Sequence, residues 1–188
     1  WMAESLTGSD WFELYNAAAS PVDLSGVYLT DDPSIIGVTK YQVTSLSFIG
    51  PGGFVKFEAD GDASQGRHHV SFNLDRLGEV IRGYGTNRTL IDSADLLPFP
   101  TGVAAGRLPD GGSTVAVFYT TPTPGQANYL PLPGVSVNEV LTHTDPPLED
   151  SIELVNASAQ SAAIGGYYLS DSQQNLKKYR IADGTTMA

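Results

Sequence analysis

Residues 10–32 read DWFELYNAAASPVDLSGVYLTDD, and a diverged copy of this stretch, SIELVNASAQSAAIGGYYLSDS, occupies residues 151–172. Placing Glu13 on Glu153 aligns the two stretches without a gap. The alignment pairs identical residues at positions that include Asn16/Asn156, Gly26/Gly166, Tyr28/Tyr168, Leu29/Leu169 and Asp31/Asp171. An ungapped match of this kind indicates that the chain contains an internal repeat.

The apolar positions that both copies retain predict a β-strand. Phe12 and Leu14 become Ile152 and Leu154, whereas the alternate position, Trp11, becomes a serine. A period of two is typical of a strand with one buried face, so we expect Phe12 and Leu14 to face a core. A glycine that both copies share then marks a turn before a second strand.

Five motifs follow one another in the first copy. They are W-x-E-L-Y-N with L-S-G-x-x-L-T-D at 11–31, GGFVKFEAD at 52–60, FNLDRLGEVIRGYG at 72–85, GRLPDGG at 106–112 and TPTPGQAN at 121–128. Together and in this order they resemble the lamin-tail domain, which is found at the tail of nuclear lamins and in large exported or surface proteins of bacteria. The last two motifs are typical of the bacterial branch.

The resemblance implies an immunoglobulin-like β-sandwich in a secreted or cell-surface protein of a bacterium. The first copy begins where the family's opening strand is already under way, and the second stops about half way, so we expect a piece of a longer protein. The expected organisation is a nearly complete lamin-tail-like module at 1–129, a proline-rich linker at 130–134, and the N-terminal half of a second module at 135–188.

Composition predicts an all-β protein as well. The 188 residues include 20 Gly and 12 Pro among short apolar runs, which favours short strands joined by tight turns. The chain has no cysteine, which excludes disulfides and cysteine-ligated metals. Its net charge of −11 argues against nucleic-acid binding and is typical of a soluble extracellular protein. No apolar run approaches the roughly 18 residues of a membrane span.

Alternating apolar residues and turn signals place further strands along the chain. We expect a polar loop at 4–10, a strand at 54–57, hairpins of 70–74 with 79–84 and of 104–108 with 114–119, a short strand at 90–92 before a proline-fixed loop at 96–100, and an alternating strand at 135–141. The apolar positions of these strands are expected to form one core, made of Phe12, Leu14, Leu24, Leu29, Phe54 or Val55, Phe72 and Val117.

An acidic loop follows the strand at 54–57. Glu58, Asp60 and Asp62 occupy alternate positions near a glycine, and Ca²⁺ prefers carboxylate oxygens on flexible loops. The loop is therefore a calcium candidate, although it lacks the twelve-residue pattern of an EF-hand. The alternative is a solvated hairpin tip without a metal. We expect no other cofactor.

Other polar groups have simpler structural explanations. Asp31 and Asp32 precede a turn, where aspartates commonly cap their own backbone. His68 and His69 point to opposite faces of an expected strand, so they do not form the pair that binds zinc on a helix. The chain has neither a cysteine nor a G-x-S-x-G nucleophile elbow. We therefore expect no enzymatic activity.

Aromatic residues provide a second candidate site. Trp11, Tyr15, Tyr28 and Tyr84 are expected on one outer face of the sandwich, as a stacking platform for a sugar or a peptide. The alternative is that they cover a sheet or a neighbouring domain. Tyr28 recurs in the second copy, which favours packing, whereas Trp11 and Tyr15 are replaced there by serine and valine. These two are the ligand-binding candidates.

The expected function is that of a non-catalytic structural or protein-interaction module in a larger exported or cell-surface protein. The alternative is an accessory module that binds carbohydrate or calcium beside an enzyme domain. Expected partners are proteins or neighbouring domains of the same chain. Because half a sandwich is not stable alone, we expect residues 135–188 to be poorly ordered or held by a complete module. One route is exchange of the strand 135–141 with a neighbouring chain.

Overall fold

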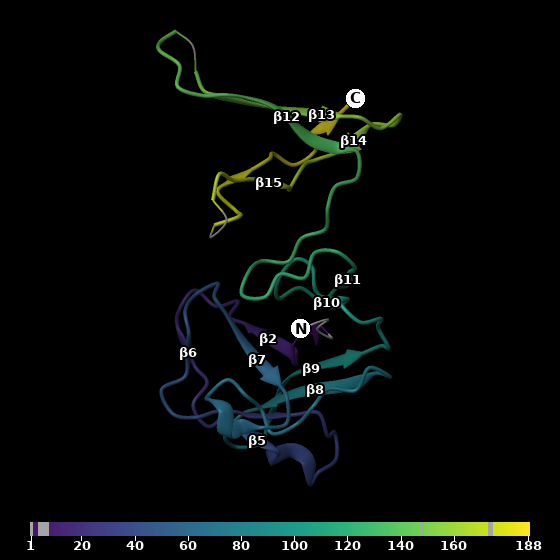
Figure 1. Cartoon of the computed structure of the whole chain (residues 1–188). Helices are drawn as coiled ribbons and strands as arrows, with labels where there is room; N and C mark the ends of the chain where they lie inside the picture. The colour runs from purple at the N-terminus through teal and green to yellow at the C-terminus, as the bar shows by residue number, and fades with distance from the viewer. Residues whose placement is uncertain (1, 4–7, 148, 173–174) are drawn as a thin grey trace. The chain divides into compact units, whose positions relative to one another are not determined.

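The computed structural model of the 188-residue chain describes residues 2–3, 8–147, 149–172 and 175–188 (Figure 1). The chain is nearly all β, as expected. Helical structure in the described residues is limited to two 3-10 turns, η1 (Gly37–Thr39) and η2 (Ala63–Gln65), and no helix there is long and apolar enough to cross a membrane. Residues 4–7 of the expected polar loop lie outside the described residues. The chain divides into two compact units, Trp1–Leu130 and Pro131–Ala188, which are described separately.

The first sheet of unit 1 has five antiparallel strands in the order β11-β10-β1-β2-β7. They are β1 (Met2–Ala3), β2 (Asp10–Tyr15), β7 (Phe54–Ala59), β10 (Ala104–Arg107) and β11 (Val115–Phe118). Phe12 lies opposite Phe57, and Trp11 opposite Glu58. Because successive side chains of a strand point to opposite faces, these two pairs lie on opposite faces of the sheet. The β10–β11 pair confirms the hairpin expected there.

The second sheet of unit 1 has four antiparallel strands in the order β5-β4-β8-β9. They are β4 (Tyr28–Thr30), β5 (Tyr41–Gln42), β8 (Glu79–Tyr84) and β9 (Leu90–Leu96). A separate two-stranded ribbon joins β3 (Val22–Asp23) to β6 (Phe48–Ile49). Strand β9 is longer than the expected 90–92 and takes in the first residue of the expected loop at 96–100.

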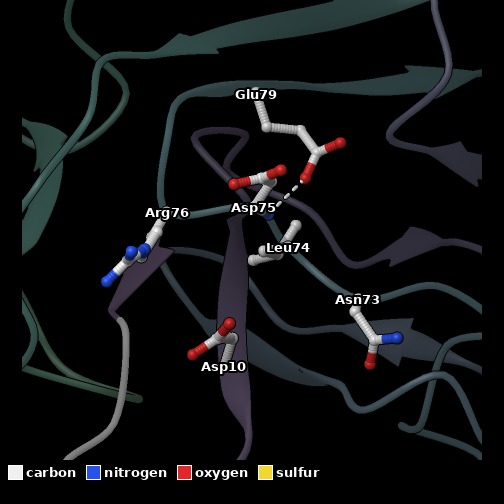
Figure 2. A pocket seen from close by; sticks show the side chains of 6 residues that line it. All are labelled: Asp10, Asn73, Leu74, Asp75, Arg76 and Glu79. Atoms are coloured by element: carbon white, nitrogen blue, oxygen red, sulfur yellow. Dashed lines mark hydrogen bonds between the residues drawn. The ribbon is translucent and has the colours of Figure 1, made fainter.

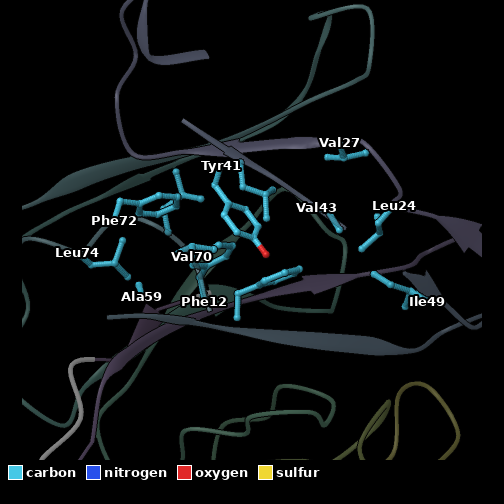
Figure 3. Close-up of a cluster of buried hydrophobic side chains, with 13 residues drawn as sticks. Phe12, Leu24, Val27, Tyr41, Val43, Ile49, Ala59, Val70, Phe72 and Leu74 are labelled. Atoms are coloured by element: carbon cyan, nitrogen blue, oxygen red, sulfur yellow. The ribbon is translucent and has the colours of Figure 1, made fainter. Parts of the chain in front are cut away.

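The main core of unit 1 joins these two sheets (Figure 3). Phe12 and Phe57 come from the first sheet, and their stacked rings have centroids 5.5 Å apart. Phe72, from the segment between β7 and β8, stacks on Phe12 at 6.0 Å. Tyr41 of the second sheet meets the Phe57 ring edge-on at 6.4 Å. Aromatic contacts therefore connect both sheets at the centre of the unit.

Most of the expected core residues belong to this cluster. Phe12, Leu24, Leu29 and Phe72 are buried in it, and Leu14 and Val55 pack against it partly buried. The expectation for Val117 is wrong. This residue is half-buried and lies outside the cluster, whereas its neighbour Phe118 is buried in a smaller cluster with Ala104. β11 is an edge strand with apolar residues at both alternate positions, so a period of two does not select its buried face.

The expected strand at 70–74 is not formed, and it does not make a hairpin with β8. The region makes an isolated bridge between Asn73 and Asp60 and single backbone hydrogen bonds to residues 58–61, and β8 pairs instead with β4 and β9. Val70, Phe72 and Leu74 alternate because they are buried in the core. A turn in which the Gly78 N–H donates to the Asp75 carbonyl at 3.2 Å then leads into β8.

Residues 121–128, which carry the TPTPGQAN motif, lie on the outer face of the first sheet. The Gly125 N–H donates to the Glu13 carboxylate, and the Asn128 side chain donates to the Arg107 carbonyl at 3.1 Å. The Asn128 N–H donates to Asp110 at 2.9 Å. Glu13 is buried under this segment, and burial raises the pKa of its carboxyl above the ordinary value. Residues 121–128 therefore form part of unit 1.

Unit 2 consists of three two-stranded antiparallel ribbons. They pair β12 (Val135–Leu141) with β13 (Ser151–Asn156), β14 (Ala162–Ala163) with β17 (Thr186–Met187), and β15 (Tyr168–Leu169) with β16 (Tyr179–Arg180). The strand expected at 135–141 is confirmed. It pairs with β13 of its own chain, with a register shift between Val137 and Glu139.

The ribbons of unit 2 reproduce contacts of unit 1. The matching contacts are the cross-strand pairs Leu29–Tyr41 and Leu169–Tyr179, and the ion pairs Lys40–Asp31 and Lys178–Asp171. The side chains of Asn16 and Asn156 each donate to the carbonyl four residues on and accept from the N–H two residues on. Local turn and strand geometry is therefore the same in the two units.

The two units differ in what covers these strands. Phe12 is 1% exposed and its counterpart Ile152 is 48% exposed, while Tyr41 is 7% and its counterpart Tyr179 is 62% exposed. In unit 1 the covering side chains come from β7, β8 and the segment 70–74, which have no counterpart in the described part of unit 2. Val140 lies opposite Ile152, and Val137 lies opposite Leu154, which is on the same face of β13 as Ile152. We call the exposed apolar surface of Val137, Val140 and Ile152 the open face.

Phe12→Ala is expected to lower the free energy of unfolding of unit 1 by about 3–5 kcal/mol, because it removes a fully buried ring from the centre of the core. Both tryptophans of the chain, Trp1 and Trp11, lie in unit 1, so tryptophan fluorescence during urea unfolding reports this unit. Ile152→Ala is the matched control at the equivalent position and should leave the transition unchanged. Equal losses from the two substitutions would contradict separate cores.

Candidate functional site

A hollow of about 330 Å³ lies on the outer face of the first sheet, near the start of β2 and the end of β7. It is lined by Gly8 and Ser9 and by the side chains of Trp11, Lys56, Glu58, Asp60, Gln65 and His69. The strand register accounts for four of these side chains, because Trp11 lies opposite Glu58, and Lys56 and Asp60 lie two residues before and after Glu58. We call this site the Trp11 hollow.

Asp60 fastens the loop that borders the hollow. Its Oδ2 atom lies 2.6 Å from His69 Nδ1 and accepts a hydrogen bond from the Gln65 side-chain amide at 3.0 Å. Its Oδ1 accepts from the Asp62 N–H at 3.1 Å. A carboxylate only accepts, so the His69 Nδ1 carries the proton in the first contact. These three contacts tie both ends of the loop that contains η2 to the end of β7.

The same contacts favour the charged form of Asp60. Partial burial is the largest single influence and raises its pKa, but the hydrogen bond and charge of His69 and the backbone N–H donors, that of Asp62 among them, together lower it. The pKa of Asp60 is therefore held below the ordinary value of 3.8. On the neighbouring strand positions, Lys56 and Glu58 form an ion pair at 2.5 Å. The Trp11 hollow thus combines an indole with one ammonium group, two carboxylates, an imidazole and an amide.

The three residues of the calcium candidate do not converge. Glu58 pairs with Lys56, and Asp60 is held by His69. The Asp62 side chain accepts from the Ser64 hydroxyl at 2.5 Å and from the Ser64 N–H at 3.0 Å at the start of η2, and these hydrogen bonds lower the pKa of Asp62. Within the described ranges, no group of three or more His, Asp or Glu side chains is arranged to hold a metal ion. The three alternating carboxylates therefore make contacts that hold the strand end and the turn.

The four aromatic candidates do not share one face, so the expected platform is wrong. Tyr28 and Tyr84 lie opposite each other in the second sheet, and Tyr84 is buried. Trp11 and Tyr15 belong to the first sheet, where Tyr15 packs against Phe54 with ring centroids 4.8 Å apart. Of the two predicted ligand-binding residues, Trp11 borders the hollow, and its ring also packs partly against the smaller cluster.

A second hollow, of about 380 Å³, opens near the start of β2 (Figure 2). Three carboxylates border it, from Asp10, Asp75 and Glu79, together with Arg76. The Asp75 N–H donates to Glu79 Oε2 at 2.6 Å, and burial raises the pKa of the Glu79 carboxyl above its ordinary value. Figure 2 shows the three carboxylates pointing in different directions. This hollow therefore offers no convergent binding geometry.

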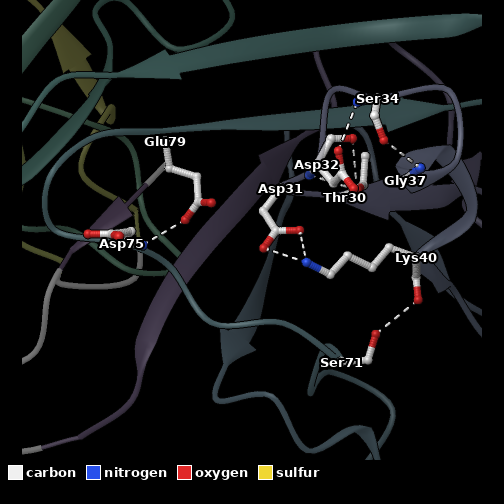
Figure 4. A network of polar contacts seen from close by, with 9 residues as sticks. All are labelled: Thr30, Asp31, Asp32, Ser34, Gly37, Lys40, Ser71, Asp75 and Glu79. Carbon is white, nitrogen blue, oxygen red and sulfur yellow. Dashed lines mark hydrogen bonds and ion pairs between the residues drawn. The ribbon is translucent and has the colours of Figure 1, made fainter.

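Asp32 caps the backbone of its own turn, as expected, whereas Asp31 pairs with a lysine (Figure 4). Asp31 forms an ion pair with Lys40 at 2.5 Å. Asp32 accepts from the Ser34 N–H at 2.8 Å, and this hydrogen bond lowers the pKa of Asp32. The Asp32 N–H in turn donates to the Thr30 hydroxyl at 3.0 Å.

The side chains of Lys56, Gln65 and His69 in the Trp11 hollow were not expected as site residues from the sequence. Lys56 had an available signal, since it alternates with Glu58 on one strand. Gln65 and His69 reach the hollow because the loop folds back, with an isolated parallel bridge between Glu58 and His69. Such a bridge depends on tertiary structure and leaves no periodic signal in the sequence.

Comparison with protein-family models finds no match, and comparisons with curated proteins and with solved structures find no significant match. Functional inference for this chain therefore rests on its own residues and geometry.

Asp60→Asn is expected to lower the free energy of unfolding of unit 1 by about 1 kcal/mol near neutral pH, because the charged partner of His69 is lost. A depressed aspartate pKa stabilises the fold above the unfolded-state value and stops doing so as the pH falls through the folded-state value. The difference in the free energy of unfolding between wild type and variant should therefore shrink as the pH falls below 3.8. Urea unfolding at several pH values measures it.

The control for this prediction is a double-mutant cycle with His69→Gln. If the two side chains act as a pair, the losses from Asp60→Asn and His69→Gln will be less than additive. Additive losses, or a difference that grows in acid, would contradict the assigned role of the pair.

Proposed function

We propose that this chain is a non-catalytic structural and protein-interaction module of a larger exported or cell-surface protein. The observation that carries the proposal is the open face of unit 2, where Val137, Val140 and Ile152 are 55%, 52% and 48% exposed on one side of a strand pair. Contiguous exposed apolar surface of this kind marks sites that another polypeptide segment covers, whether from the same protein or from a partner. Unit 1 has a closed core, which suits a structural role.

We infer that both units are lamin-tail-like modules with immunoglobulin-type topology, unit 1 nearly complete and unit 2 corresponding to its first half. Two features support this. Unit 1 places two antiparallel sheets around one core, as an immunoglobulin-like sandwich does. Unit 2 repeats the strand registers and turn hydrogen bonds of the first half of unit 1. The net charge of −11 and the motif order support an exported bacterial protein.

The polar groups of both hollows support a non-catalytic role. Asp60 is held by three donors, Lys56 is paired with Glu58, and Glu79 accepts from the Asp75 N–H. These contacts fasten turns and strand ends. A general acid or base needs instead a proton-transferring group aimed at a substrate position.

The dye ANS, which reports exposed apolar surface, is expected to bind the native chain at the open face. Ile152→Asp and Val140→Asp should each reduce the fluorescence increase severalfold, because each places a charge on that surface. Val115→Asp is the matched control, since Val115 is 53% exposed on an edge strand of unit 1. A native chain that binds no dye, or an equal effect of Val115→Asp, would contradict an accessible open face.

A second candidate function is the binding of a neutral saccharide in the Trp11 hollow. Its support is the combination of an indole with carboxylate, ammonium and amide groups around about 330 Å³. Sugars stack their apolar faces on aromatic rings and hydrogen-bond to planar polar side chains, which is the composition of this hollow.

Titration with soluble oligosaccharides is expected to change the tryptophan emission of the native chain if the hollow binds them. Trp11→Ala should weaken binding, measured by calorimetry, at least about tenfold through loss of apolar contact. Tyr119→Ala, which removes an aromatic ring that is 70% exposed elsewhere on unit 1, serves as the control. The saccharide function is excluded if no oligosaccharide of the panel binds, or if both variants lose affinity equally.

A further inference from the structure

We propose that unit 1 associates with a second copy of this chain through a surface made of Asp23, Leu46, Phe48 and Arg67, which we call the Leu46 patch. The inference goes beyond the proposed function, because the patch lies in unit 1 and includes no residue of the open face. It rests on three observations: a leucine in a conformation that disfavours it, two exposed apolar side chains, and the order of the charges beside them.

Leu46 occupies a strained position in the turn that leads into β6. Its φ is 62°, in the left-handed region that bulky side chains disfavour. Unit 2 forms the same turn, since in both units a hydroxyl donates to the carbonyl three residues before it, at 2.8 Å and 2.7 Å. The residue of unit 2 at the position of Leu46 is Gly184, with a φ of 78°. The turn therefore forms with a glycine, and the fold does not require a leucine there.

Leu46 and Phe48 both point away from the core. They are 74% and 59% exposed, while Ser47 between them is buried. In the β14–β17 ribbon of unit 2, Thr186 takes the place of Phe48 and Gly184 that of Leu46. The ribbon therefore forms without apolar side chains at these positions. Backbone strain that no burial compensates is typical of functional surfaces, so we assign a binding role to the two exposed side chains.

Opposite charges flank the two apolar side chains. The Arg67 Nη1 donates to the Leu46 carbonyl at 3.4 Å, and Asp23 lies directly opposite Phe48 across the β3–β6 pair. Both charged residues are exposed. Hydrogen bonds from the hydroxyl and the N–H of Ser25 hold the pKa of Asp23 below its ordinary value, so its carboxylate is charged at neutral pH. The patch therefore runs from a cation through two apolar residues to an anion.

This order of charges is self-complementary. A two-fold contact brings each residue of one copy to its partner residue in the other, and the reverse. An axis through the apolar pair therefore places Arg67 of each copy beside Asp23 of the other, and Leu46 beside Phe48. A membrane surface of uniform charge complements only one of the two charges. We thus assign the patch to a second copy of the chain.

The patch is much smaller than a standard protein interface, so the association is expected to be weak, with half of the chains dimeric at roughly 0.1–1 mM. Sedimentation equilibrium of the full chain up to about this concentration should show a molar mass that rises from the monomer towards the dimer value. Leu46→Gly and Phe48→Thr, which introduce the residues of unit 2, should each weaken dimerisation at least about tenfold.

The matched control is Ile35→Gln, since Ile35 is 95% exposed on another loop of unit 1. This variant should leave dimerisation unchanged. Leu46→Gly is expected to keep the urea midpoint of unit 1, because glycine adopts the left-handed conformation without strain. A loss of the dimer in Leu46→Gly is then distinct from a loss of folding.

A pair of charge reversals tests the two-fold arrangement itself. Asp23→Arg and Arg67→Asp are each expected to weaken dimerisation about threefold to tenfold, because each places like charges against one another across the axis. The double variant restores opposite charges and should recover the Kd of the parent chain within about threefold. An apolar surface that associates without a defined geometry would not show this recovery.

Several outcomes would overturn the proposal. They are a monomer mass over the whole concentration range, an equal loss of dimer in Ile35→Gln, and no recovery in the double variant. Loss of the dimer in Ile152→Asp but not in Leu46→Gly would assign the association to the open face, so that this proposal fails while the proposed function stands. Co-sedimentation of a monomeric chain with phosphatidylcholine vesicles, abolished by Phe48→Thr, would assign the patch to a membrane surface instead.

Discussion

The contact between Phe12 and Phe57 is the one on which unit 1 depends. Both rings are almost fully buried, with centroids 5.5 Å apart, and they join β2 to the neighbouring edge strand β7 on the inner face of the first sheet. Phe72 and Tyr41 extend the contact to a connecting segment and to the second sheet. A sandwich is stable only where two apolar sheet faces cover each other. In this chain that requirement is met at the aromatic centre.

The sequence predicted the parts of the fold in which apolar periodicity and pairing coincide. The strand carrying Phe12 and Leu14, the hairpin of β10 with β11 and the strand β12 are of this kind. The segment 70–74 has the same alternation without a ladder, because Phe72 and its neighbours fill the core from a connection. Periodicity records burial on one side and does not identify a hydrogen-bonded neighbour. On β11, where both alternate positions are apolar, it does not even identify the side.

The candidate site was predictable only in fragments, for a related reason. Trp11 and the acidic loop were each identified in the sequence, but as separate sites with separate ligands. The β2–β7 register places Trp11 beside Glu58, and the returning loop brings His69 to Asp60. Both relations depend on contacts between distant segments. Conversely, the alternate carboxylates that suggested calcium are each engaged by a local donor or a neighbouring cation.

The two units separate local from long-range stabilisation within one sequence. Contacts that both units retain, such as the Asn16 and Asn156 turns and the lysine–aspartate pairs, close within short loops, so they need no distant strand. The contacts that bury Phe12 in unit 1 come from residues 54–84, much further along the chain. Two-stranded ribbons are marginal in water without a covered apolar face. Unit 2 therefore has the strand geometry of its counterpart, while the equivalent apolar positions, such as Ile152 and Tyr179, stay exposed within the described residues.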